Sequence, residues 1–212
     1  MEAMYKIYSK ADERIQLKII PGHFATTQSH TTHYLDMTTM KARCSEAQYM
    51  ADVMAVNYEV STPIDTIICL DGTEVIGAFL AERLRLGGVV SMNAHQTIYI
   101  VSPEINHAGQ LVFRDNNQAM IKDKNILILA GSISTGQTLS NMIQSILYYG
   151  GKIRGISAIF STADKIAGMP IHSIFSRHDI PDYDTYPSTD CPICKAGKRI
   201  DALVSSRGYS RI

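Results

Sequence analysis

The chain has 212 residues, enough for one domain with a substantial hydrophobic core. Its 20 basic and 20 acidic residues balance, so the overall charge gives no indication of a nucleic-acid or acidic-lipid partner. There is no apolar run of the ~18–20 residues that a membrane span needs and no apolar signal core in residues 1–12, so we expect a cytoplasmic protein with reduced cysteines.

Short apolar runs alternate with amphipathic stretches, a pattern typical of a parallel sheet flanked by helices. Ser45 and Gln48 form a capping-box pair, which predicts a helix that continues to about Tyr58. Residues 64–70 predict a buried strand, and the apolar spacing after the turn at 71–73 predicts a second helix.

The clearest buried strand is predicted at residues 125–129, and a helix with a continuous apolar stripe follows it after a Ser/Thr/Gly turn. The segment beyond Ser176 is rich in Pro, Asp and Tyr, and we predict that it is irregular. The remaining strands are expected at residues 97–101, 110–113, 153–160 and 171–175.

The turn after residues 125–129 is a candidate anion site. A helix start offers unpaired backbone amides and a partial positive charge, and hydroxyl groups add neutral donors. A glycine in the turn lets the backbone approach a ligand closely, and ligands of such sheets bind at the carboxyl ends of strands. The alternative is a simple helix cap without a ligand. The predicted phosphate-binding residues are Ser134, Thr135, Gly136, Gln137 and Thr138.

Residues 131–138 also read G-x-x-x-x-G-Q-T, one residue away from the nucleotide-binding P-loop pattern. Gln137 stands where the P-loop has the lysine that meets the terminal phosphates. A P-loop usually lies near the start of its domain, whereas this loop lies beyond the middle of the chain. The P-loop interpretation is therefore the weaker one.

Residues 126–138 resemble the ribose-phosphate signature of type I phosphoribosyltransferases, which has four apolar residues, two acids, two variable residues and then [ST]-[ST]-G-x-[ST]. Further segments resemble the orotate phosphoribosyltransferases, in the same order along the chain. These are Gly22-His23-Phe24 with Tyr34-Leu35-Asp36, residues 66–84, residues 164–168 and residues 190–197. The resemblance implies a single α/β domain over residues 1–212, with a central, mainly parallel sheet flanked by helices. It also implies a small hood, from about residues 1–40 and 176–212, and a homodimer.

The sequence departs from this family at two of its sites. Ala130 and Gly131 replace the two acids that contact the ribose hydroxyls and help to stabilise the cation-like transition state, so these ribose-binding positions are degenerate. The pyrophosphate loop corresponds to Asp71, Gly72 and Thr73. Asp71 and Glu74 stand where the family tends to have small or basic residues, and a carboxylate there would oppose the binding of pyrophosphate.

The mobile loop of the family also differs. Residues 101–109 contain no Lys or Arg to close over pyrophosphate, and His107 is the single basic candidate. Lys165 stands where the family has an Arg that grips the carboxylate of the base, so it is the base-side candidate.

We therefore expect an orotate phosphoribosyltransferase-like protein that binds the 5′-phosphate of a ribonucleotide or phosphoribosyl pyrophosphate. The losses imply absent or much weakened transferase activity, and no catalytic residue is assigned. One alternative is an active orotate phosphoribosyltransferase of pyrimidine nucleotide synthesis, which would use magnesium. Another is a non-catalytic interaction module. The expected partner is a small molecule, with no nucleic acid and no membrane.

Cys191 and Cys194 form a CxxC pair, which in isolation suggests metal or redox chemistry. Zinc needs about four ligands, and no second CxxC or His pair lies nearby in the sequence. We therefore predict no metal site, with a zinc ion shared across a dimer as the alternative. The seven histidines are scattered; His30 and His33 lie in the segment that resembles a base-binding wall, and we expect the histidines to be surface or hood residues.

Overall fold

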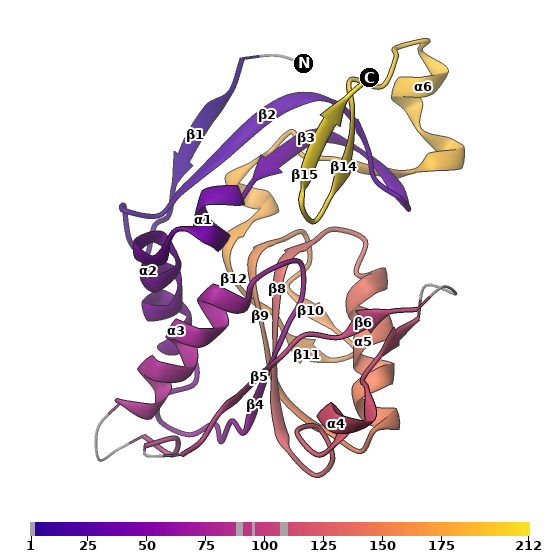
Figure 1. The fold of residues 1–212 in the computed structure, drawn as a ribbon. Coiled ribbons are helices and arrows are strands. Elements are labelled where there is room, and N and C mark those ends of the chain that lie inside the picture. The colour runs from indigo at the N-terminus through magenta and orange to yellow at the C-terminus, as the bar shows by residue number, and fades with distance from the viewer. Residues whose placement is uncertain (1–2, 88–90, 95, 107–109) are drawn as a thin grey trace.

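The structure is a computed structural model that describes residues 3–87, 91–94, 96–106 and 110–212. Two sheets form its framework, and Figure 1 shows the second sheet lying above the carboxyl edge of the central one. Within the described ranges, no helix is both long and apolar enough to cross a lipid bilayer.

The central sheet has five strands, and every neighbouring pair in it is parallel. Its strands are β4 (Thr66–Cys69), β5 (Tyr99–Val101), β8 (Asn125–Ile133), β9 (Lys152–Ser161) and β12 (His172–Ser176). They lie in the order β12-β9-β8-β4-β5. The predicted fold class, α/β with a mainly parallel sheet flanked by helices, is confirmed.

Helices cover both faces of this sheet (Figure 1). Side chains alternate along each strand, so Ile67 packs on the face covered by α2 (Cys44–Ala55) and α3 (Glu74–Arg85). Its neighbour Ile68 packs on the opposite face, against α5 (Gln137–Tyr148). Burial on both faces explains why these strands read as continuous apolar runs.

The second sheet joins strands from both ends of the chain. Its strands are β1 (Tyr5–Tyr8), β2 (Gln16–Ala25), β3 (Ser29–Asp36), β13 (Thr185–Pro187), β14 (Ala202–Ser205) and β15 (Gly208–Arg211). Their order is β13-β3-β2-β14-β15, with β1 also paired to β2. The prediction of an irregular segment beyond Ser176 is wrong, because β13, β14 and β15 form there. Their own sequences carry no clear strand pattern, and they are strands because they pair within this sheet.

Short elements complete the fold. They are α1 (Thr38–Ala42), β6 (Glu104–Ile105), β7 (Leu111–Val112), α4 (Asp115–Gln118), β10 (Lys165–Ile166), β11 (Met169–Pro170), the 3₁₀ turns Arg177–Asp179 and Ser188–Asp190, and α6 (Pro192–Lys195).

The predicted capping box at Ser45 is wrong. Helix α2 follows α1 closely and begins at Cys44, so its N-cap is Arg43 rather than Ser45, two residues earlier than predicted, and no side chain caps it. The helix ends at Ala55, and Tyr58 lies in the turn beyond it, 2% exposed.

The Tyr58 hydroxyl lies 2.9 Å from Ser157 Oγ of β9, and both side chains are buried. Burial raises the pKa of Tyr58 to about 12, so the pair is neutral at physiological pH. We expect Tyr58→Phe to lower the free energy of unfolding by roughly 1–3 kcal/mol, because it leaves the Ser157 hydroxyl without a partner. Removing both groups in Tyr58→Phe/Ser157→Ala should cost less than the two single losses added together. Urea denaturation measures this, and additive losses would contradict a coupled pair.

Candidate functional site

The predicted phosphate loop connects the end of β8 to the start of α5, at the carboxyl edge of the central sheet. Gly136 precedes the helix with a φ of 74°, a left-handed conformation that side chains rarely adopt. Thr135, Gln137 and Thr138 are exposed, and Ser134 is half-buried. The loop thus offers hydroxyl groups and the first amides of α5 to solvent, which is what an anion site requires.

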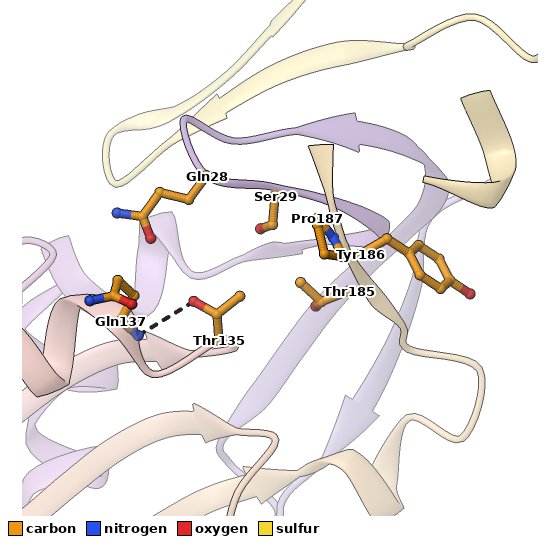
Figure 2. Close-up of a pocket in the computed structure, with 7 residues that line it drawn as sticks. All are labelled: Gln28, Ser29, Thr135, Gln137, Thr185, Tyr186 and Pro187. Atoms are coloured by element: carbon orange, nitrogen blue, oxygen red, sulfur yellow. Dashed lines mark hydrogen bonds between the residues drawn. The ribbon is translucent and has the colours of Figure 1, made fainter. Parts of the chain in front are cut away.

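Thr162, just after β9, holds the base of this loop. Its backbone amide donates to the Ile133 carbonyl at 2.9 Å, and its hydroxyl donates to the Ser134 carbonyl at 2.6 Å. Near the tip, the Gln137 amide donates to Thr135 Oγ1 at 3.4 Å, drawn dashed in Figure 2. A bond of this length is weak, so the Thr135 hydroxyl remains available to a ligand rather than serving only as a cap.

An open pocket of about 430 Å³ lies between the predicted phosphate loop and the second sheet. In Figure 2, Thr135 and Gln137 form one side of this pocket, and residues of the β2–β3 turn and of β13 face them. The lining residues are Gln28, Ser29, Thr135, Gln137, Thr185, Tyr186 and Pro187. The structure therefore brings two of the predicted phosphate-binding residues into the lining, while the other three lie in the same loop outside it.

Sequence reasoning missed the lining residues that come from the second sheet. Gln28 and Ser29 belong to an ordinary polar turn, and residues 185–187 carry no recognisable motif. Burial raises the pKa of Tyr183, just before β13, and its interactions with Thr185 and Ser134 act in the opposite direction. Tyr183 thus lies between the strand that carries residues 185–187 and the predicted phosphate loop.

Asp71 lies beside the degenerate ribose-binding positions, in the loop that follows β4. A Cβ atom placed on Gly131 would lie 3.0 Å from Asp71 Cβ and 3.5 Å from its Oδ2. Burial raises the pKa of Asp71, while the Ser132 amide, the charge of Lys41 and the Gly131 amide act in the opposite direction. The loop after β4 thus supplies a carboxylate next to Gly131, one of the two positions where the sequence pattern lacks its acids. Ala130, in contrast, is buried in the core against α5.

Lys41 of α1 is a cation that sequence reasoning did not assign to the site. Its Nζ donates to the Asp71 carbonyl at 2.7 Å and to the Ser206 carbonyl at 2.8 Å. Burial lowers the pKa of Lys41, while the charges of Asp71, Glu74 and Asp36 raise it. The lysine therefore places positive charge beside the predicted pyrophosphate-loop positions, from a helix distant in the sequence.

The other predicted site residues that the structure describes do not line the pocket. Thr73 is fully buried, and its hydroxyl donates to the Leu70 and Leu129 carbonyls, so it joins β4 to β8 rather than facing a ligand. Gly72 is exposed beside Asp71, with a φ of 77°. Lys165 is exposed on the β10–β11 hairpin and is not among the residues that line the pocket. His107 lies outside the described residues.

The CxxC pair of the C-terminal segment lies against the second sheet. Cys191 and Cys194 approach His23 of β2 and His30 of β3, and the ligand atoms of all four lie within 4.8 Å of one another. Along the sequence no His pair accompanies the cysteines, but the fold brings one to them. The sequence carries no sign of this four-residue cluster. Its members come together only when β2 pairs with β3 and the C-terminal segment packs on both strands.

No protein-family profile matches the chain. Among curated proteins, the adenine phosphoribosyltransferase of Maridesulfovibrio salexigens is 28% identical over 132 residues, which cover 59% of this chain and 75% of that protein.

Solved structures show the same fold at low sequence identity. Leishmania donovani UMP synthase matches 77% of this chain with a TM-score of 0.53 and 14% identity, and the match covers 34% of its own chain. The orotate phosphoribosyltransferase of Mycobacterium tuberculosis matches with a TM-score of 0.50 and 12% identity, over 77% of this chain and 92% of its own. The adenine phosphoribosyltransferase of Thermoanaerobacter pseudethanolicus gives a TM-score of 0.51 and 16% identity, over 82% and 95%. With its parallel sheet and the loop at the carboxyl edge, the chain has the type I phosphoribosyltransferase fold.

Proposed function

We propose that this protein binds the 5′-phosphate of a ribonucleotide in the loop of residues 134–138, and that its transferase activity is lost or much weakened. One observation carries the proposal: the exposed loop at the start of α5, with left-handed Gly136, borders an open pocket at the carboxyl edge of the sheet. This geometry suits a phosphate monoester, because amides and hydroxyls surround the anion without a bulky side chain in the way.

The groups that would bind the ribose hydroxyls and pyrophosphate in a transferase reaction are largely missing from the part of the chain that the structure describes. Ala130 and Gly131 offer no side-chain acceptor to the ribose hydroxyls, and Thr73 is turned into the core. The exposed Glu74 lies near the predicted pyrophosphate loop, and its Oε1 accepts a hydrogen bond from Ser102 at 2.7 Å. Negative charge there disfavours pyrophosphate more than it disfavours a monophosphate held at the loop.

We further propose that the bound base is orotate-like, with Lys165 on the base side, and that the protein acts as a cytoplasmic homodimer. The relatives named above include both orotate and adenine enzymes, so adenine nucleotides are the natural competitor in any binding experiment.

A second candidate function is an active transferase, and the position of Asp71 favours it. Its carboxylate lies next to Gly131, and Lys41 adds a cation beside it. In this alternative Asp71 would serve in place of a missing acid, with magnesium bound together with the substrate. Asp71→Asn would then abolish orotate consumption, which a sensitive assay with phosphoribosyl pyrophosphate and magnesium detects.

Titration calorimetry tests the favoured function. We expect uridine or orotidine monophosphate to bind more tightly than phosphoribosyl pyrophosphate with magnesium, and more tightly than adenosine monophosphate. Tighter binding of the pyrophosphate would overturn the proposal and favour the active transferase. If none of these ligands raises the melting temperature, the loop is only a helix start and the chain is an interaction module.

A further inference from the structure

A cluster of four side chains lies away from the pocket, where the C-terminal segment crosses the second sheet. His23 Nε2 lies 3.1 Å from His30 Nδ1 and 3.6 Å from the Sγ atoms of both Cys191 and Cys194. Cys194 Sγ lies 3.3 Å from His30 Nδ1. Two imidazole nitrogens and two thiol sulfurs therefore converge on one point from three separate segments of the chain.

These separations match the edges of a tetrahedron around zinc. Zinc–nitrogen bonds of about 2.05 Å and zinc–sulfur bonds of about 2.3 Å give tetrahedral edges of about 3.3 Å between nitrogens and about 3.6 Å between nitrogen and sulfur. The four nitrogen–nitrogen and nitrogen–sulfur distances lie between 3.1 and 3.6 Å. Two imidazoles with two thiolates are also a ligand set that zinc prefers.

The surroundings of His23 orient its ring for ligation. Its Nδ1 lies 3.1 Å from the Arg199 carbonyl, an acceptor that requires the proton to be on Nδ1. Nε2, the nitrogen that faces the cysteines, is then free to donate its lone pair to a metal. The His23 backbone is fixed as well, because its amide donates to Asp201 Oδ2 at 2.8 Å.

We propose that His23, His30, Cys191 and Cys194 bind one zinc ion within a single chain. Four protein ligands leave no open position, so the site is structural rather than catalytic. Three of the ligands are buried, with exposures of 3% for His23, 8% for His30 and 2% for Cys191, whereas Cys194 is exposed and gives the metal a route of entry. Each thiol releases its proton to solvent when it binds the metal.

The zinc ion would fasten the C-terminal segment to the β2–β3 pair. Strand β3 carries both the ligand His30 and the lining residue Ser29, and their register partners on β13, Tyr186 and Pro187, also line the pocket. Figure 1 shows α6, which carries Cys194, beside the second sheet. The metal thus holds in place the wall that faces the phosphate loop. The zinc site itself stands whether or not the pocket binds a nucleotide.

Metal analysis of the full chain, purified under reducing conditions from zinc-supplemented medium, tests this proposal. We expect one zinc per chain in the unmodified protein and its loss in Cys194→Ser and in His30→Ala. Cys44→Ser is the matched control, because Cys44 is also exposed but lies at the start of α2, outside the cluster. This control should keep its zinc, and a zinc chelator should lower the melting temperature of the control and the unmodified protein alike.

Cobalt substitution keeps the test decisive if a ligand variant fails to fold. The unmodified protein loaded with cobalt(II) should show the intense visible bands of a tetrahedral ion and thiolate-to-metal charge transfer in the near ultraviolet. Reduced protein without stoichiometric zinc would overturn the proposal, and so would a weak, octahedral cobalt spectrum. A Cys191–Cys194 disulfide in metal-free protein would also overturn it, in favour of a redox pair.

Discussion

We expect Gly136→Val to weaken nucleotide binding by at least tenfold, equivalent to about 1.4 kcal/mol. A left-handed backbone costs an L-residue about 1–2 kcal/mol, and a β-branched side chain adds to this cost. The new Cβ would also lie 3.2 Å from Ile166 Cδ1, so either this side chain or the loop must move, and the strained φ of 74° favours movement of the loop. Because the phosphate would be held by backbone amides of this loop, a small displacement removes several contacts together. Titration calorimetry with uridine monophosphate measures the effect.

Gly150→Val is the matched control for that variant. Gly150 lies just beyond the other end of α5 with a φ of 78°, and its Cβ would meet only Lys122 Cγ, at 3.8 Å. The control should lose stability through the same backbone strain and keep its affinity for the nucleotide. If both variants bind with unchanged affinity, the loop is not the phosphate site.

Ala130→Asp should destabilise the protein by about 4 kcal/mol at neutral pH and should not create a transferase. Ala130 is 2% exposed and packs with Leu139 and Met142 of α5, so a carboxyl there is removed from water. Burial of this kind raises the pKa of a carboxyl by ~3 units or more, at 1.36 kcal/mol per unit. Such a loss is a large share of the 5–15 kcal/mol that typically separates folded from unfolded chains. Urea denaturation and an orotate-consumption assay measure the two outcomes.

The pH dependence of the free energy of unfolding of Ala130→Asp separates the effect of the buried charge from the effect of the larger side chain. A pKa raised in the folded state means that ionisation favours unfolding. Below the unfolded value of about 3.9 both states are neutral, so the penalty is absent there and grows as the pH rises above it. Ala130→Asn has nearly the same shape without the titration, so its stability relative to the unmodified protein should change little over this range. Equal pH profiles for the two variants would contradict a buried carboxylate at this position.

The central sheet and the strand–turn–helix around residues 134–138 could be predicted from the sequence because their signals are local. Strand β8 is buried on both faces and therefore reads as a run of aliphatic residues, and α5 repeats its apolar positions at helical spacing. The turn between them carries its own chemistry in Gly136 and its hydroxyl neighbours. The two pocket-lining residues of this loop, Thr135 and Gln137, could be named from the sequence for the same reason.

The pocket residues from the second sheet and the His–Cys cluster could not be predicted from the sequence, because they are brought together by contacts between distant segments of the chain. The β3 sequence SHTTHYLD has no clear apolar alternation, so the sequence predicts surface or hood histidines and gives no sign that His30 and His33 are buried. His23 and Cys191 are 168 positions apart and meet only when the tail packs on β2. Asp71 likewise reads as a charge that opposes ligand binding until the fold places it beside Gly131, with Lys41 next to it.

The strand order of the second sheet has a consequence for how the chain folds during synthesis. Strands β2 and β3 leave the ribosome long before β14 and β13, which pair with their outer edges. Until then the β3 edge, and the part of the β2 edge that β1 does not pair with, expose unpaired amides and carbonyls, which attract other strands and promote aggregation. Closing such distant contacts is slow. The strands of the parallel sheet lie between these segments in the sequence, so that sheet can form first, and the open edges are closed only when β13 and β14 pair with β3 and β2.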